Sequence, residues 1–262
     1  MIERRNPICY EAIGADYGRT RRPDPRIARR IRAALGDAQT VVNVGAGLGS
    51  YEPADLEVTA VEPAAAMIAA RPLAAAPCVL AAAESLPFPD ASFDAAMAVL
   101  TMQHWTNVTA GLRELRRVAR RRVVLFTWDP EVDDELWLTT DYLPMIRDRD
   151  LAIFPTMQTI LAGLEPLRGS AVEPILVPHD CLDGFLGAHW RRPEAYLDPV
   201  VQAGISSFCE LGPTVTGPPL ARLAADLQSG EWRRRFGRLL ELDEVDLGYR
   251  LVTADLSHPA PS

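Results

Sequence analysis

A short apolar segment that runs directly into glycines, followed at regular spacing by similar segments, most constrains the fold. Residues 40–44 (TVVNV) lead into the glycine-rich stretch of residues 45–49 (GAGLG). Segments with helical spacing separate the further apolar runs, which cover residues 58–62, 77–80, 93–102 and 122–127. Strands that alternate with helices in this way build βαβ units. The sequence therefore predicts a doubly wound α/β domain with a mostly parallel sheet.

Overall charge and apolar patterning exclude several classes of protein. The chain has 262 residues and a formal net charge of −8, whereas domains that bind nucleic acid are typically basic. No apolar run reaches the ~18 residues that a membrane-spanning helix needs, and the N-terminus lacks the apolar region of a secretion signal. We therefore expect a cytoplasmic protein that binds neither nucleic acid nor membranes.

The cysteines and histidines of the sequence, and its lack of lysine, limit the kinds of reaction and metal site that are possible. The four cysteines form no CxxC pair, and the histidines show no HxH or HxxxH spacing, so we expect no metal site. All 27 basic residues are arginines, which we interpret as the codon bias of a high-GC bacterial genome. The absence of lysine excludes Schiff-base chemistry.

The glycines after the first strand indicate a ligand-binding loop. Gly45, Gly47 and Gly49 allow a sharp turn and a close approach of the backbone to a ligand. Glu62 ends the second strand, where a carboxylate can accept hydrogen bonds from two ribose hydroxyls. A dinucleotide fingerprint, GxGxxG, would require glycine at position 50, where this chain has Ser50. The spacing favours a nucleoside cofactor without a pyrophosphate over a nicotinamide dinucleotide.

Four segments, in this order, resemble motifs of class I S-adenosylmethionine (SAM)-dependent methyltransferases, specifically the small-molecule, type 11-like group. Residues 41–50 resemble the first motif and residues 60–63 the second. Residues 83–94 (AESLPFPDASFD) are similar to the family's AExLPFPDxSFD stretch, and residues 112–118 (LRELRRV) resemble the helix that follows. The resemblance spans residues 40–128.

The resemblance implies a Rossmann-like sheet of seven mostly parallel strands, an antiparallel last strand and a helical cap. It also implies S-adenosyl-L-methionine as the cofactor and an N-terminal lid helix carrying Tyr17. The cofactor-binding residues that it implies are Tyr17, Asn43, Gly45, Ala46, Gly47, Gly49, Glu62, Pro63, Ala83, Glu84 and Ser85.

Three positions depart from the family pattern. Asn43 replaces an acidic residue often found before the glycine loop, which lessens negative charge near the ammonium group of the methionine portion. Ala82 stands where the family often has an aspartate that binds the adenine amino group. Residues 119–122 (ARRR) replace the usual Pro-Gly-Gly after the helix.

Three residues are candidates for catalysis. His104 follows the fourth strand, and an imidazole that titrates near neutral pH can act as a general base. His179 and Asp180 lie in a polar and aromatic segment that follows a candidate strand end, where ligand sites of α/β proteins occur, and His189 is a further candidate to face the substrate. Local packing of His104, or helix capping by Asp180, is the alternative for these side chains.

Residues 171–177 and 245–253 look like two further strands within a mostly helical second half. Taken with the resemblance, this predicts a division into lid helices (1–36), a SAM-binding core (37–130), a cap on the substrate side that includes the strand at 171–177 (131–242), the last strand (243–256) and a disordered tail (257–262).

The expected function is methyl transfer from SAM to a small-molecule acceptor, in bacterial specialised metabolism. Two alternatives stay open: the same fold with another reaction, such as an elimination or cyclisation, and a non-catalytic partner subunit. Exposed aromatic residues of the cap could form a homodimer interface.

Overall fold

The computed structural model of the chain describes residues 20–132 and 136–256. These residues form two compact units. The sheet unit contains residues 25–132, 153–175 and 248–256, and the helical unit contains residues 20–24, 136–152 and 176–247. Within the described residues, no helix combines the length and the apolar character needed to cross a lipid bilayer.

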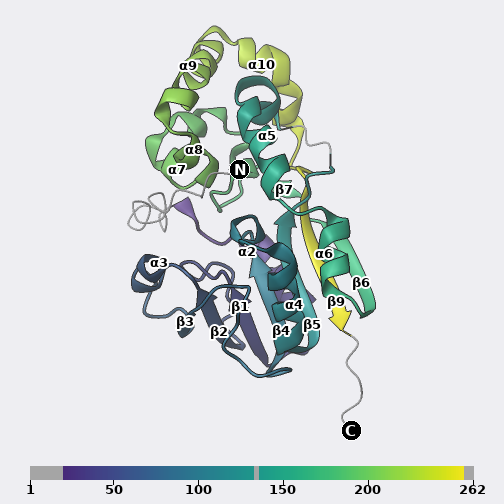
Figure 1. Ribbon diagram of the computed structural model, residues 1–262. Coiled ribbons are helices and arrows are strands. Elements are labelled where there is room, and N and C mark those ends of the chain that lie inside the picture. The colour runs from purple at the N-terminus through teal and green to yellow at the C-terminus, as the bar shows by residue number, and fades with distance from the viewer. Residues whose placement is uncertain (1–19, 133–135, 257–262) are drawn as a thin grey trace. The chain divides into compact units, whose positions relative to one another are not determined.

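Seven strands of the described residues form one sheet, in the order β3-β2-β1-β4-β5-β9-β6 (Figure 1). The first five strands run parallel, and β9 is antiparallel to both of its neighbours, β5 and β6. The predicted doubly wound, mostly parallel sheet with an antiparallel last strand is confirmed. The strands are β1 (Thr40–Val44), β2 (Glu57–Glu62), β3 (Cys78–Leu80), β4 (Phe93–Val99), β5 (Ala119–Trp128), β6 (Leu167–Pro174) and β9 (Tyr249–Leu256).

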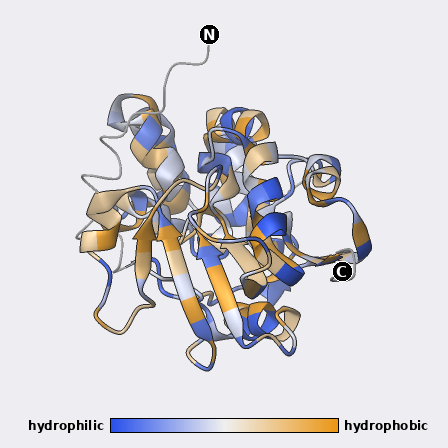
Figure 2. Cartoon of the chain, turned by 60° about the horizontal axis from the view of Figure 1, so that its bottom comes forward, coloured by the Kyte–Doolittle hydropathy of each residue, from blue (hydrophilic) through white to orange (hydrophobic). Residues whose placement is uncertain are grey.

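The apolar residues of the strands build the core of the sheet unit. Val42 and Val44 of β1 pack in one buried cluster with Leu112 of helix α4 (Val108–Val118) and Ile160 of helix α6 (Met157–Leu164). These two helices lie on the same face of the sheet (Figure 1). Successive residues of a strand point to opposite faces, so Asn43 points away from this cluster. The strands are largely hydrophobic, as the orange segments in Figure 2 show, which is typical of a buried parallel sheet.

Three further helical segments complete the sheet unit. Helix α2 (Pro25–Ala34) contacts β5 and buries Ile27 and Ile31. The others are α3 (Ala65–Ala69) and the 3-10 turn η1 (Met102–His104). Asn107 caps the start of α4, because its side-chain oxygen accepts the N–H of Ala110 at 3.0 Å.

The connection between β1 and β2 differs from an ordinary crossover. Parallel neighbours are usually joined through a helix, but residues 45–56, all of which the structure describes, form turns and no helix. The glycine loop of this chain is therefore not the first turn of a helix. Other contacts have to hold it in place.

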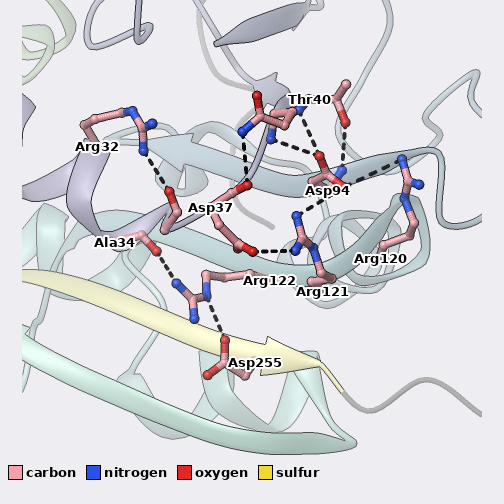
Figure 3. Close-up of polar contacts among 11 residues, drawn as sticks. Arg32, Ala34, Asp37, Thr40, Asp94, Arg120, Arg121, Arg122 and Asp255 are labelled. Carbon is pink, nitrogen blue, oxygen red and sulfur yellow. Dashed lines mark hydrogen bonds and ion pairs between the residues drawn. The ribbon is translucent and has the colours of Figure 1, made fainter. Parts of the chain in front are cut away.

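At the opposite, amino-terminal end of these strands, Asp94 joins β1 to β4 (Figure 3). Its Oδ2 accepts the backbone N–H groups of Gln39 (2.9 Å) and Thr40 (3.1 Å), and its own N–H donates to the Thr40 hydroxyl at 3.0 Å. Arg121 lies 3.3 Å from Asp94 and 2.9 Å from Asp37. Burial opposes ionisation of Asp94, but these hydrogen bonds and the neighbouring arginines lower its pKa. The carboxylate thus fixes the register at which the two strands begin.

The helical unit is built around buried aromatic residues. The ring of Trp137 lies 5.7 Å from that of Tyr142, 5.6 Å from that of Tyr196 and 5.3 Å from that of Trp232, all nearly perpendicular. Its indole N–H donates to the carbonyl of Trp190 at 2.7 Å. The elements around this cluster are η2 (Leu138–Tyr142), α5 (Pro144–Ile153), β7 (Val177–Pro178), η3 (Leu186–His189), η4 (Pro193–Leu197), α7 (Pro199–Ala203), α8 (Ser206–Leu211), α9 (Pro213–Ser229), α10 (Glu231–Phe236), η5 (Gly237–Glu241) and β8 (Glu244–Val245).

Two strand boundaries differ from the predicted ones. The strand predicted at 171–177 is β6 at Leu167–Pro174, and the one predicted at 245–253 is β9 at Tyr249–Leu256. Val177 and Val245 instead pair with each other in a separate two-stranded sheet of the helical unit. Gly248, at a φ of +81°, separates β8 from β9. Alternation of side chains could not reveal this change of partner.

Candidate cofactor site

The glycine loop requires its glycines for reasons internal to the protein. Gly45, Gly47 and Gly49 have φ angles of +72°, +51° and +96°, which residues with a Cβ rarely adopt. A Cβ on Gly45 would lie 2.0 Å from the hydroxyl oxygen of Thr101, and one on Gly49 would lie 2.9 Å from Oε2 of Glu52. Close packing inside the sheet unit alone therefore excludes larger residues at two of the three positions.

Backbone hydrogen bonds tie the loop to the end of β2. The N–H groups of Gly45 and Ala46 both donate to the carbonyl of Val61, at 2.8 and 3.0 Å. The N–H of Gly47 donates to Oε2 of Glu62 at 2.9 Å. The loop and the acidic residue predicted to face a ribose are thus joined directly.

Glu62 can accept further hydrogen bonds. Its other oxygen, Oε1, accepts the N–H of Ala64 at 3.0 Å, and the residue is 8% exposed. Burial raises the pKa of Glu62, although the two N–H donors and the charge of Arg71 oppose this effect. A carboxylate offers about four lone-pair sites, so each oxygen retains acceptor capacity for a ribose hydroxyl. Pro63, the next predicted residue, is exposed.

Two buried acceptors near the carboxyl ends of the neighbouring strands β1 and β4 have no hydrogen-bond partner in the described structure. They are Oδ1 of Asn43 and Oε1 of Gln103. A buried polar atom without a partner costs about 1–3 kcal/mol, so a donor supplied by a ligand would be stabilising. The ammonium group of the methionine portion of SAM is such a donor. The donors that SAM carries therefore match these acceptors and Glu62, and cofactor binding by Asn43 and Glu62 stays a prediction.

The stretch that most resembles the family is held by α4. Arg117 donates to the carbonyls of Leu86 (3.0 Å) and Phe88 (2.7 Å) and pairs with Glu114 at 2.7 Å. The Glu114 carboxylate accepts the N–H of Leu86 at 2.7 Å. The AESLPFPD and LRELRRV segments are therefore bonded directly to each other in the fold.

Within that stretch, the side chain of Glu84 has a structural role. Its Oε1 accepts the N–H of Asn107 at 2.9 Å, at the start of α4. Ala83 is buried and Ser85 is exposed, with the Ser85 N–H donating to the carbonyl of Ala82 at 3.2 Å. Cofactor binding by Ala83, Glu84 and Ser85 stays a prediction.

His104 lies at the end of η1, after a strained residue. Leu100 has a φ of +47°. Its N–H donates a hydrogen bond to the carbonyl of Phe126 at 2.7 Å, which stabilises this conformation. Strained backbone of this kind is frequent at functional sites. The amide nitrogen of Gln103 lies 3.2 Å from Nε2 of His104. An amide nitrogen only donates, so Nε2 is the acceptor of this hydrogen bond. A role of His104 as general base therefore requires the acceptor molecule to replace Gln103 as the donor to Nε2.

The other predicted residues lie in the helical unit or outside the described residues. His179 is held locally, with Nδ1 3.2 Å from the carbonyl of Asp243, and Asp180 is exposed. His189 is 9% exposed and neither ring nitrogen has a hydrogen-bond partner in the described structure. Tyr17 lies outside the described residues. Catalytic roles for His104, His179 and Asp180 stay predictions.

Sequence reasoning missed Thr101, Gln103 and the pair formed by Glu52 and Arg71. Arg71 Nη2 lies 2.7 Å from Oε1 of Glu52. No motif marks this pair, because its members are 19 residues apart and meet only once the chain has turned back. For Thr101 and Gln103, proximity to the end of the fourth strand was the only available signal.

Comparisons with known proteins identify the family of this chain. Residues 42–127 match a family described as a methyltransferase domain. A crystal structure of an inferred methyltransferase from an antibiotic biosynthesis pathway of Anabaena variabilis is similar, with 33% identity, a TM-score of 0.83, and coverage of 89% of this chain and 98% of that one. A search of curated proteins gave no match.

Two more distant structures share the fold. Phosphoethanolamine N-methyltransferase 2 of Haemonchus contortus, solved with SAM, has 12% identity, a TM-score of 0.56, and coverage of 96% of this chain and 56% of that one. Geranyl diphosphate C-methyltransferase of Streptomyces coelicolor, solved with S-adenosyl-L-homocysteine, has 16% identity, a TM-score of 0.51, and coverage of 88% and 78%. Both of these structures contain SAM or the product of its demethylation, S-adenosylhomocysteine. This chain belongs to the class I SAM-dependent methyltransferase family.

Proposed function

We propose that this protein transfers a methyl group from SAM to a small-molecule acceptor in bacterial specialised metabolism. One observation carries the proposal: the glycine loop is bonded to Glu62 beside the unsatisfied acceptors of Asn43 and Gln103. The antibiotic pathway of the Anabaena variabilis relative supports the class of acceptor.

Positioning is the main task of the residues in this site. When bound, SAM would supply an activated methyl group: the nucleophilic atom of the acceptor forms a bond to the methyl carbon while the methyl–sulfur bond breaks and S-adenosylhomocysteine leaves. Holding the two reactants in line supplies much of the acceleration of such a reaction. Glu62 would hold the ribose, and Asn43 and Gln103 would hold the ammonium group. Where the acceptor must lose a proton, His104 would take it at Nε2, with the acceptor replacing Gln103 as the donor to that nitrogen.

The helical unit is the candidate for selecting the acceptor, because the motifs shared with the family lie in the sheet unit. His179 and Asp180 are the polar side chains that we propose to contact the acceptor. A cytoplasmic location and a homodimer also remain proposals.

Calorimetric titration with SAM and S-adenosylhomocysteine, followed by an activity assay, tests the function. We expect micromolar binding of both ligands. With methyl-labelled SAM and a low-molecular-weight extract of a high-GC bacterium, we expect a labelled product and stoichiometric S-adenosylhomocysteine. Binding without S-adenosylhomocysteine formation from any extract or acceptor panel would favour the non-methylating alternative. A folded protein that binds neither ligand would contradict the proposal altogether.

A further inference from the structure

A buried ion pair lies beside the glycine loop. Nη2 of Arg71 lies 2.7 and 2.9 Å from the two carboxylate oxygens of Glu52, and the two side chains are 5% and 8% exposed. The N–H of Ala76 donates to Oε2 of Glu52 at 3.0 Å. Separating the two partners of such a pair would leave uncompensated buried charges, which is strongly destabilising. The two side chains therefore stay paired.

The β1–β2 connection contains no helix, and this ion pair instead holds the glycine loop in place. Nη1 of Arg71 donates to the carbonyl of Gly47 at 2.8 Å, and Nη2 also donates to that of Ala76 at 3.1 Å. Glu52 fills the space where a Cβ on Gly49 would lie. The pair therefore contacts the glycine loop at both Gly47 and Gly49.

Glu52 also orients Asn43. Nδ2 of Asn43 donates to Oε1 of Glu52 at 3.2 Å. An ionised carboxylate only accepts hydrogen bonds, so the amide nitrogen must face Glu52 and Oδ1 must face away from it. Asn43 is 1% exposed, and its Oδ1 has no hydrogen-bond partner in the described structure. The amide is thus fixed with one buried acceptor unsatisfied.

The same contact explains why residue 43 is neutral. An aspartate there would place a second carboxylate within hydrogen-bond distance of Glu52, and two carboxylates that share a site cannot both ionise without a large cost. The negative charge of this region is already supplied by Glu52 and balanced by Arg71. Asn43 is therefore the residue that matches Glu52.

We propose that the Glu52–Arg71 pair is a positioning device of the cofactor site. It holds the glycine loop and turns Asn43 so that Oδ1 accepts a hydrogen bond from the ammonium group of SAM. The inference rests on the proposed function only in requiring that SAM binds.

Calorimetric dissociation constants for SAM and S-adenosylhomocysteine, measured with the melting temperature of each variant, test the inference. Asn43→Ala should weaken the binding of both ligands by about tenfold or more, because a hydrogen bond to a charged group is lost. Asn43→Asp should weaken binding at least as much. The double variant Asn43→Asp/Glu52→Gln again has one carboxylate and one amide in contact and should bind more tightly than Asn43→Asp. The matched control is Asp55→Asn. Asp55 lies in the same β1–β2 connection and forms an exposed ion pair with Arg32, so this variant should bind SAM like wild type.

The inference is wrong if Asn43→Ala lowers only the melting temperature and keeps the wild-type affinity. It is also wrong if Asn43→Asp binds like wild type, or if the double variant binds no better than Asn43→Asp. If Asn43→Asp does not fold, the affinities of Asn43→Ala and of the double variant for SAM test the inference instead. A wild-type protein that binds SAM without transferring methyl groups would overturn the proposed function and leave this comparison valid.

Discussion

Glu62 accepts the N–H of Gly47 at 2.9 Å, so one carboxylate anchors the glycine loop and also stands where a ribose would bind. A 15-residue separation in sequence becomes a direct contact, because β1 and β2 are parallel neighbours whose carboxyl ends meet. The first two of the four motifs that resemble the family are therefore joined directly. Changes to either should alter both the loop and the affinity for the cofactor.

Glu62→Ala should weaken SAM binding by about tenfold or more, because hydrogen bonds from two hydroxyls to a charged acceptor are lost. Since burial raises the pKa of Glu62, the wild-type affinity should also begin to fall, on acidification, at a higher pH than for an exposed glutamate. Calorimetry between pH 7.5 and 5 measures both effects. Glu57→Ala, at the exposed beginning of the same strand, is the control. Unchanged affinity in Glu62→Ala would exclude the ribose role.

Gly45→Ala and Gly47→Ala should differ strongly in stability. At Gly45 the new Cβ would lie 2.0 Å from the Thr101 hydroxyl, whereas at Gly47 its nearest neighbour would be 3.6 Å away. We expect Gly47→Ala to cost only the ~1–2 kcal/mol of a positive φ, and Gly45→Ala to cost at least ~3 kcal/mol through overpacking as well. Urea unfolding measures the difference, with Gly169→Ala, which meets no neighbour, as the control. Equal losses at the two sites would contradict the packing of Gly45 on Thr101.

His189 should make stability pH-dependent. Burial, with a smaller effect from the charge of Arg192, lowers the pKa of His189 from 6.5 to about 4. Below pH 6.5 the unfolded chain binds a proton at this ring, while the folded chain does not until about pH 4. The free energy of unfolding should therefore fall with falling pH in this window, by up to about 3 kcal/mol.

Urea unfolding at pH 7, 5.5 and 4.5 of wild type and His189→Phe checks this effect. The acid-induced loss should be smaller in His189→Phe, because phenylalanine does not titrate. If His189→Phe loses as much stability on acidification as wild type, the neutral buried state of His189 is wrong.

Arg117→Lys should destabilise the sheet unit by about 1–2 kcal/mol, because lysine lacks the planar fork that reaches two carbonyls and two carboxylates at once. The loss is modest because the Arg117 side chain is 30% exposed and water screens its ion pairs. Arg113→Lys, on the exposed side of α4, should change stability by less than about 0.5 kcal/mol. Thermal unfolding of both variants measures the difference. Equal stability would show that the loop does not depend on Arg117.

The sequence by itself determined the fold class, the glycine loop, the acidic residue after β2 and the family. These features are local: a strand of β-branched residues, a glycine at a fixed spacing and a twelve-residue motif can each be recognised without knowing what lies across the sheet. The predicted boundaries of β6 and β9 shifted because neighbouring segments with the same alternation pair with different partners.

Only the tertiary structure decided how the site is held. The contact of Asn43 with Glu52, the ion pair of Glu52 with Arg71 and the packing of Thr101 against Gly45 each join residues that are not neighbours in sequence. The burial of His189 likewise depends on the whole helical unit. Their energetics depend on desolvation and on distances of about 3 Å, which no residue pattern specifies. The neutral residue before the glycine loop, a departure in the sequence, is the consequence of a buried charge that only the folded chain brings next to it.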